Sequence, residues 1–142
     1  MQITFSLPHA FYPGSSRDED AYALRALLDC LIRLNQAYLR YHAVPALYRA
    51  GVVYGRTEVW DTIPALYDKK FGDCKSLTAA RIAELRAQSI EAEPVFRWVQ
   101  RPDGSGSDYH ILVQREACKE WPDGFEDPSK VLGMGKNENA RH

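Results

Sequence analysis

The sequence has no excess of charge of either sign. Its 142 residues include 18 lysines and arginines against 19 aspartates and glutamates, which gives a net charge of −1. Basic residues are nowhere concentrated over more than a few positions. Binding to nucleic acid depends on a basic patch that neutralises phosphates. The composition therefore argues against a nucleic-acid-binding protein.

The sequence also lacks a long hydrophobic run. Although 45% of the residues are hydrophobic, no stretch approaches the roughly 20 apolar residues that cross a bilayer. The start of the chain has no basic segment, and Pro8 and His9 interrupt the region where a signal peptide would be hydrophobic. We therefore expect a cytoplasmic protein without membrane contacts. Ile3, Phe5 and Leu7 alternate with polar residues, and this pattern predicts a strand at the start of the fold.

Cysteine is scarce, and the three cysteines are widely separated. Cys30, Cys74 and Cys118 show no metal-ligand spacing and form no even set for disulfides. A metal held by Cys74 and His110 would lack its third and fourth ligands. We therefore expect a reducing compartment, no metal and no cofactor. Cys30 falls among leucines of a predicted helix and is interpreted as a core residue, and Cys118 as a turn residue.

What is present fits one α+β domain. The length suits a single domain over residues 1–134, followed by a polar tail over residues 135–142. Hydrophobic periodicity predicts helices over residues 17–41, 63–69 and 74–90. β-Branched and aromatic residues predict two antiparallel strands over residues 95–99 and 109–113, and a weaker extended segment ends at Asp127. We expect the N-terminal helices and the helix that begins at Cys74 to pack on this sheet.

Cys74 opens the third predicted helix, directly after Gly72 and Asp73. Asp73 is a good N-cap residue, and glycine allows a sharp backbone turn. The positive end of the helix dipole favours the thiolate form of a cysteine, so the position suits a nucleophile. The negative charge of Asp73 works against the thiolate, so a positive partner, such as an imidazolium, is needed. The alternative is a buried structural cysteine.

His110 and Asp127 are the candidate partners of Cys74. His110 begins a hydrophobic strand, and Asp127 follows the next extended segment, just before a proline. A cysteine nucleophile needs a base to carry its proton, and the base needs an acceptor that orients its ring. Both residues also have structural explanations, because a strand histidine is often a packing residue and an aspartate before proline often forms a turn.

These motifs resemble the core of the transglutaminase-like superfamily, which has the papain-like cysteine-protease fold. The resemblance covers residues 58–134 and rests on the order Cys, His, Asp and on four local motifs. These are Trp60 and Pro64 upstream, Phe71-Gly72-Asp73-Cys74, Tyr109-His110 and Glu126-Asp127-Pro128. The type that it resembles is the small, stand-alone member found in bacteria and prophages.

The resemblance implies a role for each matching residue. Cys74 is the expected nucleophile, His110 the general base and acid, and Asp127 the carboxylate that orients the imidazole. The backbone N–H of Cys74 and the indole N–H of Trp60 are the expected oxyanion donors, with Asp73 beside them in the cleft. The sequence departs from the family pattern in two places. Ser89 replaces a common glycine after the helix, and Lys75 and Ser76 replace acidic residues, which predicts a different cleft rim.

The expected function is hydrolysis by a cysteine peptidase or amidase, through a thioester intermediate. A protein or peptide is the expected substrate, because the acyl chemistry acts on amides and esters. One alternative is a catalytically silent module with a structural or adaptor role, associated with a phage virion and binding an assembly partner protein. Another is an acyltransferase of the transglutaminase type, in which an amine replaces water. The sequence leaves the oligomeric state open.

Arg81 interrupts the apolar stripe of the predicted cysteine helix. A buried guanidinium without an acceptor is costly. We therefore expect Arg81 to pair with a carboxylate or to extend to the surface.

Overall fold

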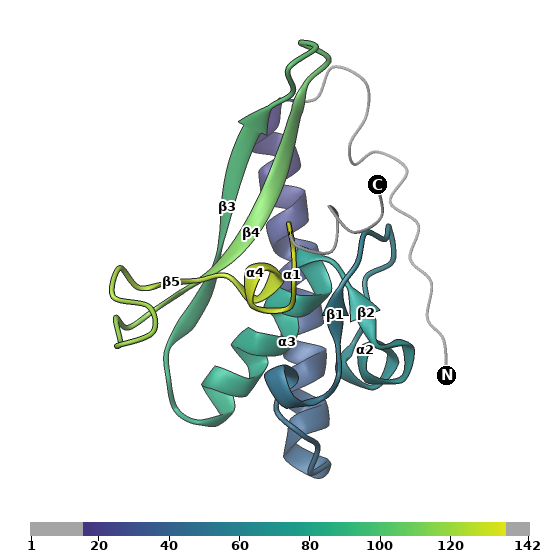
Figure 1. Cartoon of the computed structure of the whole chain (residues 1–142), viewed down its shortest axis with the longest axis vertical. Helices are drawn as coiled ribbons and strands as arrows, with labels where there is room; N and C mark the ends of the chain where they lie inside the picture. The colour runs from purple at the N-terminus through teal and green to yellow at the C-terminus, as the bar shows by residue number, and fades with distance from the viewer. Residues whose placement is uncertain (1–15, 136–142) are drawn as a thin grey trace.

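The computed structural model describes residues 16–135. The strand expected at Ile3 to Leu7 and residues 136–142 of the expected tail lie outside the described residues. The described part has an α+β architecture, in which helices pack on a three-stranded antiparallel sheet (Figure 1). No helix within this part is both long enough and apolar enough to cross a membrane.

Helix α1, Arg17–Tyr41, has the bounds that the sequence predicts. Ser16 caps it by accepting a hydrogen bond from the backbone N–H of Glu19 at 3.1 Å. One face of α1 is buried and carries Leu24, Leu28, Leu31, Ile32 and Asn35. The interpretation of Cys30 as a core residue is wrong, because Cys30 is exposed on the other face. Apolar residues occur on both faces of α1, and the sequence does not indicate which face is inward.

The sheet consists of β3 (Ala92–Gln100), β4 (Ser107–Arg115) and β5 (Phe125–Glu126). The strand order is β3-β4-β5 and both pairs are antiparallel, so β4 lies at the centre. Strands β3 and β4 form a long hairpin that extends past the rest of the sheet (Figure 1). His110 lies within β4, opposite Arg97, and not at its start as expected.

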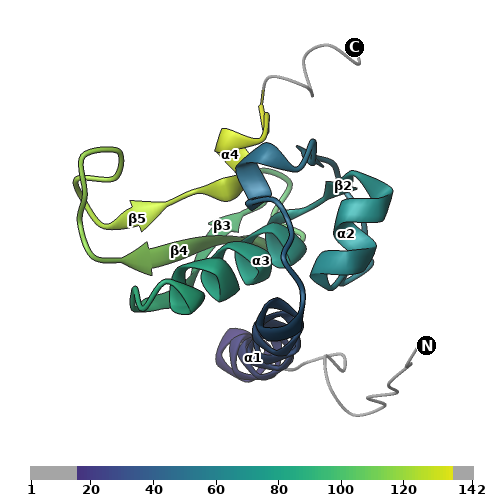
Figure 2. The same ribbon diagram turned by 90° about the horizontal axis from the view of Figure 1, so that it is seen from below.

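Helix α3, Cys74–Ala87, lies between α1 and the sheet (Figure 2). Its residues are buried on nearly every side, so the single inward stripe that periodicity predicts is too narrow a description. The helix ends three residues before the predicted Ile90. It ends there because Ser89 adopts a left-handed backbone conformation with φ of 62°, which an α-helix cannot continue through.

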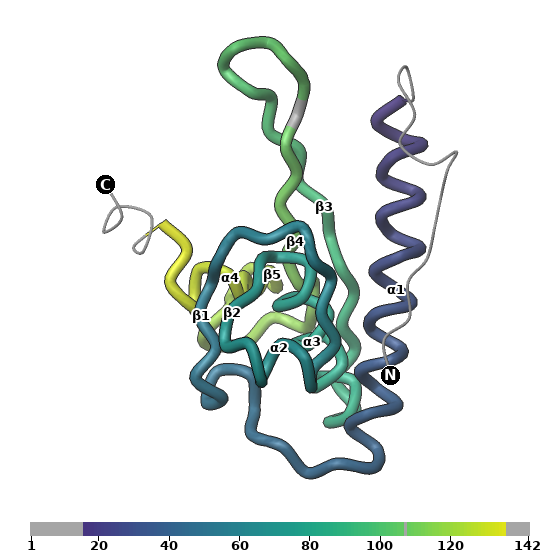
Figure 3. The backbone as a smooth tube through the Cα atoms, turned by 90° about the vertical axis from the view of Figure 1, so that its right-hand side faces the viewer, coloured from purple at the N-terminus to yellow at the C-terminus, as the bar shows by residue number. Residues whose placement is uncertain are grey.

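The segment between α1 and α3 forms a second layer against α3 (Figure 3). It contains a short 3₁₀ turn η1 (Leu47–Arg49), strand β1 (Val53–Tyr54), helix α2 (Ile63–Lys69) and strand β2 (Phe71–Gly72). Strands β1 and β2 are parallel, and the short helix α4 (Pro128–Val131) lies beside β1. This layer brings the chain to Cys74, while β5 and α4 bring Asp127 to the same end of α3.

Candidate functional site

Cys74 is the first residue of α3 and is 9% exposed. Asp73 is the N-cap residue, as predicted, and its carboxylate accepts a hydrogen bond from the backbone N–H of Lys75 at 3.1 Å. Gly72 is required for a different reason from the one expected. Its backbone has no positive φ, but a Cβ atom at this position would lie 2.6 Å from Cδ1 of the fully buried Leu66. A glycine therefore allows α2 to pack against the start of α3.

Lys75 offsets the negative charge beside Cys74. Its ammonium group forms an ion pair with Asp73 and donates a hydrogen bond to the carbonyl oxygen of Thr57 at 3.1 Å. Burial raises the pKa of the Asp73 carboxyl, although the hydrogen bonds and charge of Lys75 act in the opposite direction. The expectation that Lys75 and Ser76 alter the cleft rim is only half right. Lys75 lines the cavity beside Cys74, whereas Ser76 is fully buried and accepts a hydrogen bond from the backbone N–H of Asp61.

His110 lies between Cys74 and Asp127. Its Nε2 atom is 2.9 Å from Oδ2 of Asp127. Its imidazole lines the same cavity as Cys74, and the Cys74 side chain contributes to the pKa of the ring. Because Asp127 uses Nε2, the nitrogen that remains for the sulfur is Nδ1. Burial lowers the pKa of His110, but the hydrogen bonds and charges of Asp127 and Cys74 outweigh burial and raise it to about 9. The ring is therefore an imidazolium at neutral pH.

Asp127 has two structural roles, one for each carboxylate oxygen. It is the N-cap of α4, where Oδ1 accepts a hydrogen bond from the backbone N–H of Lys130 at 3.2 Å. Its other oxygen, Oδ2, contacts the imidazole of His110. The local turn that the sequence suggested and the orienting carboxylate are thus the same residue. Fixing one oxygen in a helix cap holds the other oxygen toward His110.

A buried ionic network fixes the strand that carries Asp127. Glu126 is fully buried and accepts hydrogen bonds from Arg81 at 2.5 Å, from Arg115 at 2.9 Å and from the hydroxyl of Tyr48. Burial acts to raise the pKa of Glu126, but hydrogen bonds from Arg81, Tyr48 and Arg115 hold it below its usual value. Arg81 also pairs with Glu84 at 3.1 Å. The prediction that Arg81 pairs with a carboxylate is confirmed.

Cys74 and His110 line one cavity of about 440 Å³. Its walls come from β1 and the loop after it, from the start of α3, from the loop between β3 and β4 and from β4. The other described residues that line it are Tyr54, Arg56, Thr57, Glu58, Asp73, Lys75, Arg101, Asp108 and Tyr109. The cavity is open to solvent, and both candidate residues form part of its wall. Both carboxylates and guanidinium groups line the cavity, so its charge is mixed.

Tyr109 is a cleft residue whose contribution sequence reasoning missed. Its ring makes edge contacts with Phe96 and Trp98, at centroid distances of 6.0 and 5.6 Å. Burial raises the pKa of Tyr109 to about 12, and the nearby charges of Cys74 and Asp73 add to this effect. The phenol is thus a neutral hydrogen-bond donor at the cavity. Its position directly before His110 was the only signal in the sequence.

Trp60 lies close to the site without lining the cavity. Its ring packs against the hydrophobic cluster that includes Cys74, and Nζ of Lys75 lies 5.8 Å from the ring centroid. Among the described residues that form the cavity wall, Trp60 is absent. A role for its indole N–H as an oxyanion donor stays a prediction. Over residues 16–135, no three His, Cys, Asp or Glu side chains are grouped in a way that could hold a metal ion.

Comparisons with known proteins add no relative to this description. No protein-family model, curated protein or solved structure matches the chain. The functional argument therefore depends on the geometry of the site alone.

Proposed function

We propose that this protein is a cysteine hydrolase of the transglutaminase-like type, a peptidase or amidase that forms a thioester on Cys74. One observation carries the proposal. Cys74, at the start of a helix, lines one cavity together with His110, which Asp127 contacts at 2.9 Å. This order of groups meets the requirements for an activated nucleophile, namely a thiol, a neighbouring base and a group that orients the base.

In the acylation step, the thiolate of Cys74 attacks the carbonyl carbon of the substrate, and a C–S bond forms. The carbonyl oxygen becomes an oxyanion, for which the unpaired N–H of a first-turn helix residue such as Cys74 is a suitable donor. The imidazolium of His110 then gives its proton to the leaving amine, and the C–N bond breaks. The products are a thioester on Cys74 and a free amine.

In the deacylation step, neutral His110 removes a proton from water. The resulting hydroxide attacks the thioester carbonyl, the C–S bond breaks, and the carboxylic acid leaves. The proton stays on His110, which restores the thiolate and imidazolium pair. Asp127 faces the imidazolium throughout, so its negative charge stabilises the protonated ring. Water balances the reaction, and no cofactor is needed.

The test is to trap the thioester. The native protein and Cys74→Ala would each be incubated with a peptide library and analysed by intact mass spectrometry after an acid quench. We expect a mass increase on the native protein alone, with the added group mapped to Cys74 and removed by hydroxylamine. Discharge by an added amine faster than by water would indicate acyl transfer in place of hydrolysis.

Alkylation of Cys74 distinguishes an enzyme from a catalytically silent module. A thiolate paired with His110 reacts with iodoacetamide at neutral pH faster than a free cysteine does. If Cys74 reacts no faster than a free thiol, and its alkylation rate rises with a pH midpoint near the ordinary thiol pKa of about 8.5, the hydrolase proposal is wrong. A structural or adaptor role is then favoured. A cysteine in a short unstructured peptide is the reference for a free thiol.

A further inference from the structure

The outer face of α1 is apolar and faces solvent. Tyr22, Leu34 and Tyr41 are 82%, 52% and 81% exposed, and Ala26 and Cys30 are exposed on the same face. These five positions recur at intervals of four and seven residues, which places them within an arc of about 120° on a helix of 3.6 residues per turn. The face lies opposite the buried one that packs on α3. Helix α1 therefore has one apolar face toward the core and a second apolar face that no other segment within residues 16–135 covers.

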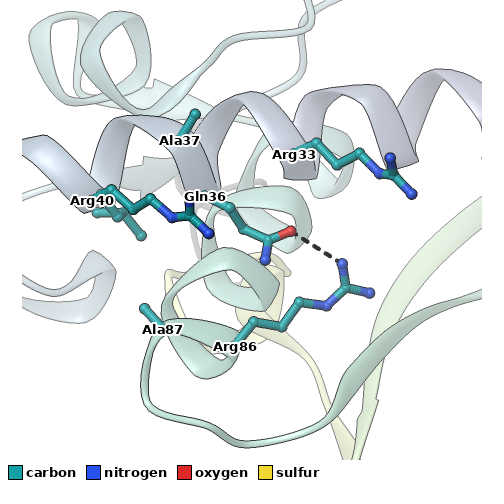
Figure 4. A pocket seen from close by; sticks show the side chains of 7 residues that line it. Arg33, Gln36, Ala37, Arg40, Arg86 and Ala87 are labelled. Atoms are coloured by element: carbon teal, nitrogen blue, oxygen red, sulfur yellow. Dashed lines mark hydrogen bonds between the residues drawn. The ribbon is translucent and has the colours of Figure 1, made fainter.

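Unpaired basic groups lie along one edge of this face. Figure 4 shows Arg33, Gln36 and Arg40 of α1 beside a cavity of about 750 Å³, with Arg86 of α3 across it. The carbonyl oxygen of Gln36 accepts a hydrogen bond from Arg86 at 3.3 Å, which leaves its amide N–H groups for another acceptor. Arg33 and Arg40 have no acidic partner among residues 16–135. The cavity wall thus offers hydrogen-bond donors and needs acceptors.

The acceptors that fit are at the other end of the same helix. Asp18, Glu19 and Asp20 form the first turn of α1, and Arg40 lies in the last turn. Two copies of α1 packed antiparallel about a two-fold axis at Cys30 would place the acidic first turn of each copy against Arg40 of the other. The same register puts Ala26 opposite Leu34, so a small residue faces a large one. The face is therefore complementary to itself in both shape and charge.

We propose that the outer face of α1 is a homodimer interface, in which two copies of the chain pair α1 with α1 in the antiparallel direction. Packed helices have axes about 8–10 Å apart. At that spacing two cysteines on the axis reach the Cα separation of about 4.4–6.8 Å that a disulfide allows. None of the described residues that line the cavity at Cys74 belongs to α1, so pairing through α1 leaves this cavity wall unchanged.

Sedimentation equilibrium over about 1–100 μM, under reducing conditions, tests the proposal because dimerisation follows mass action. We expect a dimer in the native chain. Leu34→Asp places a charge in the interface, and we expect a dissociation constant at least about tenfold higher. Val99→Asp is the matched control, since Val99 is 62% exposed on β3, and it should leave the constant unchanged.

Charge reversal tests the direction of the helices. Arg40→Glu should weaken the dimer by about three- to tenfold, and adding Asp18→Arg to it should restore the native constant, because the two charges exchange sides. A parallel pair would not show this rescue. With a mild oxidant, we expect a disulfide-linked dimer through Cys30 that Cys30→Ser abolishes and Leu34→Asp reduces.

Three results would each overturn the proposal. The first is a monomer at all concentrations, and the second is a dimer that Leu34→Asp does not affect. The third is a dimer that forms only after residues 2–15 have been deleted, because the occupant of this face would then be the chain's own N-terminal segment. Circular dichroism on each variant establishes that the fold is intact, and exposed positions on α1 are expected to tolerate these changes.

Discussion

His110 is the residue on which the proposed chemistry depends, and its protonation state follows from its surroundings. Asp127 and Cys74 favour the charged ring and outweigh burial, so its pKa is about 9 and not 6.5. The sequence identified all three residues, because each has an unusual local setting: a helix start, a polar residue in an apolar strand and an acid before proline. It could not indicate the pKa, which depends on contacts between residues far apart in the chain.

We predict that the alkaline limit of activity follows the His110 pKa. The leaving amine needs the proton of His110, so kcat/KM should be constant toward pH 9 and fall by about tenfold per pH unit above it. In Asp127→Asn the imidazole loses its carboxylate contact, while an asparagine can still cap α4. The alkaline fall of kcat/KM should therefore move to lower pH, because the carboxylate no longer raises the pKa of His110. NMR titration of the imidazole in Cys74→Ala and Asp127→Asn should give pKa values below 9 in both variants.

The same titration affects stability, and the sign follows from the direction of the pKa change. The folded-state pKa lies above the usual value of 6.5, so His110 stabilises the fold fully below about pH 6.5 and this contribution is lost as the pH rises through 9. Urea denaturation between pH 6 and 10 should show the decline, and His110→Gln should remove it. An equal decline in both proteins would contradict the assignment.

At the scale of elements, the least expected contact joins α1 to α2. Thr62 occupies the N-cap position of α2, and threonine is a common capping residue, but its side chain makes no capping bond. The fully buried Asn35 of α1 does so in its place, because its Oδ1 accepts a hydrogen bond from the backbone N–H of Ile63 at 2.8 Å. A cap supplied by another helix cannot be read from local sequence.

We predict that Asn35→Ala destabilises the protein by about 1–3 kcal/mol. The buried N–H of Ile63 would lose its acceptor, and leaving such a group unpaired costs that amount. Chemical denaturation measures the change. Gln36→Ala is the control on the next residue of α1, and it should cost no more than about 0.5 kcal/mol because the side chain is half-exposed. Equal losses in both variants would show that the cap is not the cause.

At the scale of the whole molecule, Glu126 joins three parts of the chain. Tyr48 of η1, Arg81 of α3 and Arg115 of β4 all donate to its carboxylate. Together these contacts tie the segment after α1, the central helix and the sheet to the strand that precedes Asp127. The network therefore supports the fold and the position of the candidate site together.

We predict that Glu126→Ala is among the most destabilising single changes, at about 3–5 kcal/mol. Removing one member of a buried ionic group leaves other charges uncompensated, and here Arg115 would lose its carboxylate partner while Arg81 would keep only Glu84. The free energy of unfolding in urea measures the loss, with the exposed Glu116→Ala as control. A loss below about 1 kcal/mol would mean that water replaces the carboxylate. The alkylation rate of Cys74 should fall in Glu126→Ala, because Asp127 is no longer held.

Periodicity and local capping chemistry were enough to predict α1, α2, the antiparallel hairpin and the candidate site residues from the sequence. Four features could not be predicted in this way: the buried face of α1, the end of α3, the need for Gly72 and the pairing of Arg81 and Arg115 with Glu126. Each of them depends on groups that packing brings together. Periodicity reports that a face is apolar, whereas contacts between distant segments determine what covers it and which charges it keeps.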